Sequence, residues 1–207
     1  MSKLGLLSVL STTVLLLSGC ATQYPPTTQA LTLSPLHVLS QQLEETSGLY
    51  CTDDRLFTIN DSGNEAKVFE LNYDGLVTQT YPLPLRNIDW EAITGDDEFL
   101  YIADIGNNKG KRETLMVHKV SRRDYNHVDS FSIQYAGNEP SDNFPYAHDF
   151  DAEAMVLAEG KLLIFSKSWR TGIANVYEVG SETQQILTPI AHIAGLPGVI
   201  TGADFDE

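Results

Sequence analysis

The chain has 207 residues, of which 28 are acidic and 13 are basic, giving a formal net charge of −15 at pH 7. A protein this acidic repels nucleic acid and anionic lipid surfaces, so we expect no nucleic-acid partner and favour cationic, neutral or metal-bridged ones. The sequence contains no Gly-x-Ser-x-Gly elbow, His-Glu-x-x-His helix, Walker loop or glycine-rich dinucleotide fingerprint, which argues against the commonest enzyme classes.

Residues 1–19 have the pattern of a signal peptide. Lys3 precedes an apolar run over residues 4–17, and small residues follow it. Such a run is short for a membrane span and is typical of a secretory signal. The ending Leu17-Ser18-Gly19-Cys20 resembles the lipobox of bacterial lipoproteins, in which the cysteine thiol is acylated and becomes the new N-terminus. An uncleaved anchor or an ordinary signal followed by a chance cysteine is the alternative.

Lipidation of Cys20 would make the mature chain an exported domain held at a membrane by its lipid anchor. Ala21 follows the cysteine, and by resemblance to Gram-negative lipoproteins this favours the outer membrane. Residues 20–30 then form the lipidated cysteine and an uncharged tether with two prolines. Residues 31–207 form the one domain. Cys51, in an apolar-alternating segment, is interpreted as a core thiol.

One pattern recurs three times along this domain. A small residue is followed eight positions later by an apolar strand, and an acid lies three positions before the small residue. The three spans are 48–56, 92–100 and 154–162. In the second and third copies another acid lies one position before the small residue. Repeats at such spacings are typical of propeller blades.

Each copy contains four short β-rich runs, and the first has a strong hairpin signal at Tyr73-Asp74-Gly75. No window has the apolar period of a helix. We therefore predict an all-β fold, a β-propeller of four-stranded antiparallel blades. The expected strands are near 47–51, 55–60, 67–72, 76–83, 92–95, 99–104, 113–120, 130–136, 154–158, 161–166, 173–179 and 185–193.

A fourth copy begins at Ile200-Thr201-Gly202-Ala203 and then the sequence stops. Because blades bury their faces only against neighbours and a ring needs closure, we expect a partial, open arc of three blades and the start of a fourth, truncated at the C-terminus. Residues 30–39 could add an outer strand to a last blade. A complete four-bladed or sandwich-like protein is the alternative.

The acids of the repeat are candidate metal ligands. Positions three and one before the small residue fall on the same side of an extended strand, so Asp89 with Glu91, and Asp151 with Glu153, are expected to be paired carboxylates. In propellers generally, these positions and the loops between second and third strands open on one face. Calcium takes six to eight oxygen ligands of this kind. The candidate ligands are Glu45, Asp89, Glu91, Asp104, Asp151 and Glu153, with Asp61, Asn64 and Asn107 as further oxygen donors.

Two other readings of these residues stay open. The same acids and amides could cap strands and make Asx-type turns without any metal. His148, Asp151 and Glu153 form the densest local cluster of acid–base groups and are candidate catalytic residues, although a histidine beside carboxylates can equally be a structural residue. Lys167 and Arg170 break the acidic pattern in the third copy, and could pair with these acids or bind an anionic ligand or partner.

Three segments carry a family resemblance: residues 86–93 (Arg-Asn-Ile-Asp-Trp-Glu-Ala-Ile), 101–108 (Tyr-Ile-Ala-Asp-Ile-Gly-Asn-Asn) and 151–154 (Asp-Ala-Glu-Ala). With them the chain resembles a poorly characterised group of exported bacterial β-propeller lipoproteins over residues 44–205. Asn107 stands where that group usually has Asp. The group is broadly similar to NHL, phytase-like and gluconolactonase-like propellers, some of which hold calcium in the channel and hydrolyse esters.

These observations lead to three functional hypotheses. The first is an outer-membrane-anchored propeller, facing the periplasm or the cell surface, that binds a small ligand or a protein partner on its acidic rim. The second is a calcium-dependent hydrolase of phosphate esters, lactones or other esters at the central channel. The third is a structural scaffold of the envelope. Whether the protein is an enzyme is left open.

Overall fold

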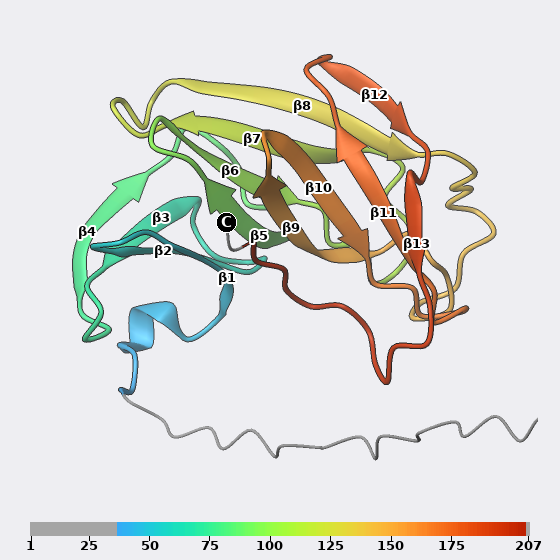
Figure 1. Ribbon diagram of the computed structural model, residues 1–207, viewed down its shortest axis with the longest axis horizontal. Coiled ribbons are helices and arrows are strands. Elements are labelled where there is room, and N and C mark those ends of the chain that lie inside the picture. The colour runs from blue at the N-terminus through green and yellow to red at the C-terminus, as the bar shows by residue number, and fades with distance from the viewer. Residues whose placement is uncertain (1–36, 206–207) are drawn as a thin grey trace, which may run out of the picture. The chain divides into compact units, whose positions relative to one another are not determined.

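The computed structural model describes residues 37–205, so the predicted signal peptide, Cys20 and the tether lie outside the described residues and remain predictions. Within this range the fold is all-β, with three sheets, one short 3-10 turn (η1, Gln41–Leu43) and no α-helix. No helix among these residues is long and apolar enough to cross a membrane. The sheets do not close into a barrel within the described range (Figure 1).

Each sheet is built mainly from consecutive antiparallel strands, close to the predicted ranges. The first sheet contains β1 (Thr46–Cys51), β2 (Leu56–Asn60), β3 (Lys67–Leu71) and β4 (Val77–Pro82). The second contains β5 (Trp90–Gly95), β6 (Phe99–Asp104), β7 (Leu115–Ser121) and β8 (Val128–Tyr135). The third contains β9 (Ala152–Ala158), β10 (Lys161–Ser166), β11 (Ala174–Val179) and β13 (Ala191–Ile193).

Local turn chemistry explains why these boundaries follow the sequence closely. In the predicted hairpin between β3 and β4, Gly75 adopts a φ of 77°, and Asn72 Oδ1 accepts hydrogen bonds from the backbone N–H groups of Asp74 and Leu76. Asp96 does the same between β5 and β6, where its Oδ1 accepts from the N–H of Phe99. Asn and Asp side chains stabilise turns in this way because they replace a missing backbone partner.

The predicted strand at 185–193 is wrong in one respect, because the segment forms two strands in different sheets. β12 (Gln184–Leu187) pairs in parallel with β8 and becomes the fifth strand of the second sheet, whereas β13 pairs with β11. Pro189 lies between them and has no N–H for a sheet hydrogen bond, which explains the break. Leu187 of β12 is buried in the core shared by the second and third sheets, and this burial favours the pairing of β12 with β8.

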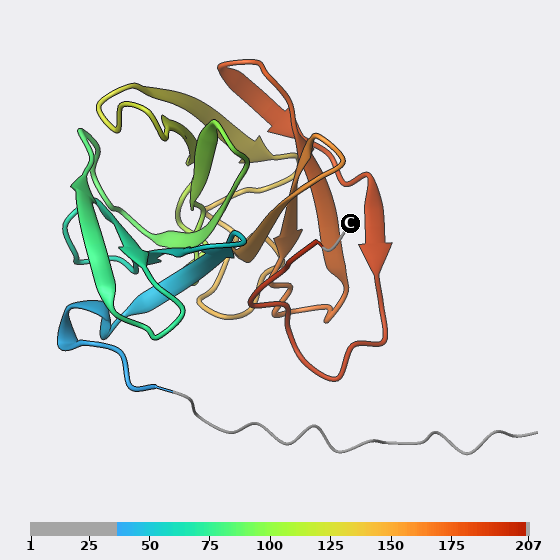
Figure 2. The ribbon, with the colours of Figure 1, turned by 60° about the vertical axis from the view of Figure 1, so that its left-hand side comes forward.

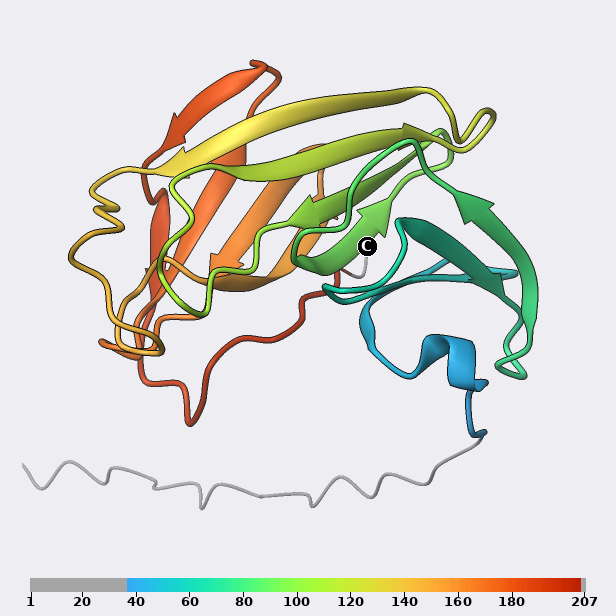
Figure 3. The same ribbon diagram turned by 180° about the vertical axis from the view of Figure 1, so that it is seen from behind.

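The first strands of the three sheets, β1, β5 and β9, lie side by side (Figures 1 and 2). Gly48 in β1 allows close approach: a Cβ there would lie 2.8 Å from the backbone nitrogen of Ile93 in β5. On the other side of β5, Thr94 Oγ1 accepts a hydrogen bond from the N–H of Leu157 in β9 at 3.2 Å. The three sheets fan out from these inner strands, as the view from behind also shows (Figure 3).

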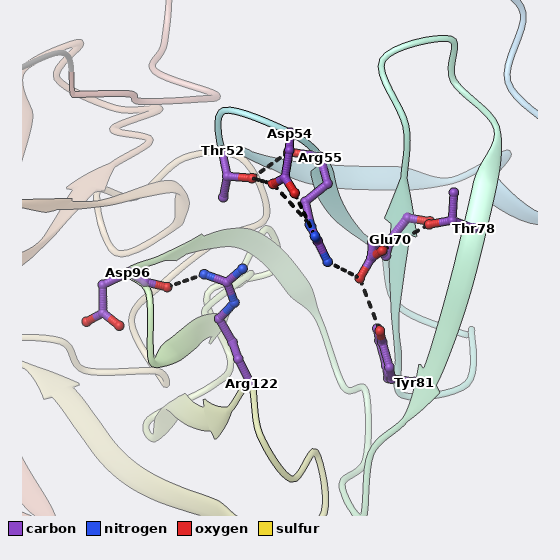
Figure 4. A network of polar contacts seen from close by, with 8 residues as sticks. All are labelled: Thr52, Asp54, Arg55, Glu70, Thr78, Tyr81, Asp96 and Arg122. Atoms are coloured by element: carbon purple, nitrogen blue, oxygen red, sulfur yellow. Dashed lines mark hydrogen bonds and ion pairs between the residues drawn. The ribbon is translucent and has the colours of Figure 1, made fainter.

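Apolar side chains and one polar network hold the first and second sheets together. Phe57, Ile59, Trp90 and Ile102 belong to a core cluster built from both sheets. At its edge the buried carboxylate of Glu70 accepts hydrogen bonds from Arg55, Thr78 and Tyr81 (Figure 4). Tyr81 stacks on Tyr125, from the loop between β7 and β8, with ring centroids 3.7 Å apart. Glu70 is therefore a buried acid with three donors, one of them cationic.

One smaller expectation is wrong, and a second is tested only in part. Cys51 is exposed and free, because it is the last residue of β1, beside the turn to β2, and its side chain does not enter a core. The described part of the 30–39 segment, residues 37–39, is not a strand. Leu39 instead lines a cavity with side chains of the first sheet.

Candidate functional site

A β-bulge occurs at the same position in each of the three inner strands. The pairing skips Ser47 between Thr46 and Gly48, Glu91 between Trp90 and Ala92, and Glu153 between Ala152 and Ala154. The skipped residue is always the one before the small residue of the repeat. A bulge interrupts the alternation of a strand and redirects a side chain, so Glu91 and Glu153 are presented differently from residues of a regular strand.

Three carboxylates meet beside the bulge of β5. Single oxygen atoms of Asp61, Asp89 and Glu91 lie within 4.8 Å of one another. Gly106 lies directly against two of these groups, since a Cβ at this position would collide with the carboxylates of Asp89 and Glu91. We call Asp61, Asp89 and Glu91 the acidic triad. The predicted pairing of Asp89 with Glu91 agrees with this arrangement, and Asp61 joins them from the loop after β2.

The loops that carry the triad are fixed by side-chain hydrogen bonds. Asn87 Nδ2 donates to the carbonyls of Asn60 and Asp61 at 2.9 and 2.8 Å, which ties the loop after β2 to the segment before β5. The carboxylate of Asp104 accepts hydrogen bonds from the backbone N–H of Asp89 and from Arg112, the latter at 2.5 Å. The triad is therefore held on rigid supports.

Two members of the triad, Asp61 and Glu91, line an acidic cavity of about 390 Å³ where the inner strands begin. The cavity is lined by Glu45, Thr46, Ser47, Asp61, Glu91, Glu153 and Thr201. Ser47 Oγ is buried and has no hydrogen-bond partner within the described residues. An apolar cavity of about 480 Å³ shares Glu91 and Glu153 with it. Glu45, Glu91 and Glu153 thus converge on one cavity, as expected for one shared face.

Burial and neighbouring acids make the ionised form of Glu91 unfavourable. Glu91 is only 7% exposed. Desolvation raises its pKa to about 9, with further contributions from Glu153, Asp61, Asp89 and Asp151. The pKa of Asp89 is also raised by desolvation, although hydrogen bonding by Ser62 and the charge of Arg112 oppose the rise. Such a site gains most from a cation that reaches it.

The acids of the third copy have different partners. Asp151 is fully buried, and its oxygens accept hydrogen bonds from the backbone N–H of Asn107 at 2.7 Å and from Trp169 Nε1 at 2.8 Å. Glu153 forms an ion pair with Lys167, whose ammonium also lies 4.6 Å from the centroid of the Trp169 ring. Asp151 and Glu153 therefore do not form a carboxylate pair like that of Asp89 and Glu91.

The other candidate ligands also have protein partners. Asp104 is buried and ion-paired with Arg112. Glu45 is exposed and accepts a hydrogen bond from Asn64 Nδ2 at 2.5 Å. Of the six predicted metal ligands, only Asp89 and Glu91 belong to the acidic triad. The structure brings Asp61 to them in place of Asp104 and Asp151.

His148, the predicted acid–base residue, is buried in a different set of contacts. Its Nδ1 accepts a hydrogen bond from the N–H of Phe150 at 3.1 Å, and its Nε2 faces the carbonyl of Asn108 at 3.4 Å. Gly110 leaves room for the ring, because a Cβ there would approach it to 2.7 Å. None of the side-chain hydrogen bonds of His148 within residues 37–205 involves a carboxylate. The structure does not bring it to the triad.

The two cations of the third copy, Lys167 and Arg170, pair with different acids. Lys167 is mostly buried against Glu153, whereas the side chain of Arg170 is 65% exposed and pairs with Asp149 at 3.3 Å. Asp149 also accepts hydrogen bonds from the backbone N–H groups of Arg170 and Thr171, both at 3.0 Å. Both cations thus pair with acids, which was one of the two readings of the sequence.

Sequence reasoning missed two residues that shape the site. Gly106 looks like an ordinary turn glycine in Asp104-Ile105-Gly106-Asn107, and only the fold places it against two carboxylates. Arg112 lies beyond the repeated motif and neutralises Asp104. A signal for Arg112 was available, because a buried acid in a strand usually requires a basic partner nearby.

No protein-family model matches this chain, and no curated protein matches it significantly. Among solved structures, it is similar to the crystal structure of the computationally designed Ika4 protein. The TM-score is 0.41 and the sequence identity 10%, over 85% of this chain and 89% of that one. A likeness of this size carries no argument about function.

Proposed function

We propose that the chain is an exported, lipid-anchored binding domain of the β-propeller type, whose acidic cavity captures a cationic or metal-bridged ligand or protein partner. The observation that carries this proposal is Glu91, a buried acid that faces the cavity without a hydrogen bond from any described residue. A buried carboxyl group with no donor and a strongly raised pKa, facing a cavity, is a feature that is common at functional sites.

The propeller reading is supported by the three consecutive four-stranded units whose first strands lie side by side. Each unit carries the small residue and the bulge at the same place. A propeller encloses a central channel between its inner strands, and the acidic cavity lies where β1, β5 and β9 begin. The resemblance to exported bacterial propeller lipoproteins agrees with this proposal.

Calorimetry with a cationic probe tests the binding proposal. We expect spermidine, or a peptide rich in Lys and Arg, to bind the full chain, and raising the salt concentration to weaken this binding. Glu91→Gln should weaken it at least about tenfold, which corresponds to ~1.4 kcal/mol. Asp129→Asn, which removes the same charge from an exposed position in β8, is the matched control. Equal affinity in both variants would contradict a role for the cavity.

The lipid anchor is tested separately, since Cys20 lies outside the described residues. Mass spectrometry of the protein from a Gram-negative host should detect an acylated N-terminal cysteine, and the wild-type protein should fractionate with the outer membrane. Cys20→Ala should abolish acylation and release the protein from the membrane fraction. A Cys20→Ala protein that stays anchored would favour an uncleaved apolar anchor.

A calcium-dependent hydrolase is the second candidate, favoured by the close approach of Asp89 and Glu91 beside a cavity. Paired carboxylates with a metal can activate water for ester hydrolysis. The test is hydrolysis of p-nitrophenyl phosphate, p-nitrophenyl acetate and a simple lactone with calcium or with a chelator. Calcium-dependent turnover that disappears in Glu91→Gln supports an enzyme. Ligand binding without turnover supports the binding domain. The absence of both binding and turnover favours a structural scaffold.

A further inference from the structure

We infer that Asp61, Asp89 and Glu91 form a binding site for one divalent cation of the calcium class. This inference rests on the proposed function, because Asp61 and Glu91 line the acidic cavity, and it identifies the cation that the cavity would take. The site joins the loop after β2 to the start of β5 and therefore links the first and second sheets.

The spacing of the oxygen atoms fits calcium. Protein oxygens lie about 2.3 to 2.6 Å from Ca²⁺, so two ligand atoms on opposite sides of the ion are about 5 Å apart. One oxygen from each member of the triad lies within 4.8 Å of the others, so all three can contact one ion without moving apart. Mg²⁺ demands near-ideal octahedral geometry, gives up its waters reluctantly and is usually held by one or two carboxylates, so three protein carboxylates favour Ca²⁺.

A second observation, independent of the clustering, is the missing partner of Glu91. The buried carboxylates of the described residues are Glu70, Glu91, Asp104, Asp149 and Asp151. Glu70 is bound by Arg55, Asp104 by Arg112 and Asp149 by Arg170. Asp151 accepts two neutral donors. Among these five carboxylates, only Glu91 has neither a cationic partner nor a neutral hydrogen-bond donor, and it lines the acidic cavity.

The protein's own cations near this region are already engaged. Lys167 pairs with Glu153. Arg112 donates to Asp104 and to the carbonyl of Gly106, the latter at 2.6 Å. No ion pair within residues 37–205 involves a member of the triad. No described protein cation therefore balances the charge of the triad, and a divalent cation from solution can do so compactly.

Gly106 has a defined role in this site. Without a side chain it lets the carboxylates of Asp89 and Glu91 lie directly against the backbone. Any larger residue would push at least one of them away. Ser47 lines the same cavity, and its Oγ is buried without a hydrogen-bond partner among the described residues. Water molecules from the cavity would complete the coordination shell.

The experiment is calorimetric titration of CaCl₂ into the full chain after treatment with a chelator, repeated with MgCl₂. We expect a single Ca²⁺ to bind, more tightly than Mg²⁺. Asp61→Asn and Glu91→Gln should each weaken Ca²⁺ binding at least about tenfold, since each removes a charged ligand. Asp129→Asn, with the same loss of charge on an exposed strand position, should bind like the wild type.

The outcomes separate this inference from the proposed function. If Ca²⁺ does not bind at millimolar concentration, or if the triad variants bind it as well as Asp129→Asn does, the metal site is refuted. If spermidine still binds in that case, the binding domain stands without the metal; if neither binds, both proposals fail. Circular dichroism checks that each variant is folded. If Glu91→Gln does not fold, the titration of Asp61→Asn, a change at a half-buried loop residue, decides the question.

Discussion

The second and third sheets contain the same Asp-x-Glu-Ala motif, yet its acids have opposite surroundings. In the third sheet, Asp151 accepts two hydrogen bonds and Glu153 is paired with Lys167. In the second sheet, Asp89 and Glu91 lie together, and no basic side chain of residues 37–205 forms an ion pair with them. The comparison teaches that a motif fixes where acids are placed, whereas the residues of neighbouring loops decide whether those acids serve structure or bind something.

The two loops that follow the second strands account for the difference. The loop after β10 supplies Lys167 and Trp169, which bind the two acids of the third sheet directly. At the corresponding place after β6, Gly106 supplies no side chain and leaves space for the acids. The third sheet therefore has an internal cation at the place where the second sheet is open to an external one.

The largest expected effect is a loss of stability on replacing Asp151, the acid of the third sheet that holds neighbouring groups in place. Asp151→Ala would leave the N–H of Asn107 and Nε1 of Trp169 without their acceptor in a buried region. Each lost partner costs about 1 to 3 kcal/mol, so we expect the free energy of unfolding to fall by ~2–5 kcal/mol. Urea denaturation measures it. Asp142→Ala, at an exposed loop residue, should change stability by less than about 0.5 kcal/mol.

The next effect makes the third sheet resemble the second. Lys167→Met removes the cation from Glu153 while keeping most of the apolar volume, and both side chains are largely buried. We expect a loss of about 1–3 kcal/mol in the free energy of unfolding. The double variant Lys167→Met/Glu153→Gln should recover most of this loss. If the double variant is as unstable as the single one, the ion pair is not the cause.

Per pH unit, a smaller effect with the opposite sign is expected for Glu91. Its pKa of about 9 lies above the ordinary 4.5, so between these values the folded protein holds a proton that the unfolded chain has lost. The free energy of unfolding should therefore fall as pH rises from 4.5 towards 9, by up to about 1.4 kcal/mol per pH unit.

Glu91→Gln should remove this dependence and make the protein more stable than the wild type at pH 8. Urea denaturation in the presence of a chelator, at pH 5, 7 and 9, measures the slope. Glu70→Gln is the informative control, because Glu70 has Arg55, Thr78 and Tyr81 as donors and its replacement should destabilise the protein. If the pH dependence of stability persists in Glu91→Gln, another titratable group causes it.

The smallest effect is expected at Arg170. Its side chain is 65% exposed, and two backbone N–H groups already bind the carboxylate of Asp149. Exposed ion pairs contribute little, so Arg170→Ala should lower stability by about 0.5 kcal/mol or less. A thermal denaturation series at low and high salt measures it. A loss above about 2 kcal/mol would place Arg170 with Lys167 as a structural cation.

Strand positions could be predicted from the sequence because their signals are local. The turn around Asp74-Gly75 and the alternation of apolar residues act over a few positions, and the observed strands lie close to the predicted ranges. The exchange of β12 into the second sheet could not be predicted. It depends on Leu187 finding a buried place beside β8, and no local pattern records that contact.

For the candidate site, the sequence by itself determined which segments carry acids and that Asp89 and Glu91 lie beside each other at the start of an inner strand. Only the tertiary structure decided that Asp61 joins them, that Gly106 makes room for them and that Lys167 neutralises Glu153 instead. The physical reason is that turns and strands form from short-range preferences, whereas the fate of a buried charge depends on partners that the fold brings from distant parts of the chain.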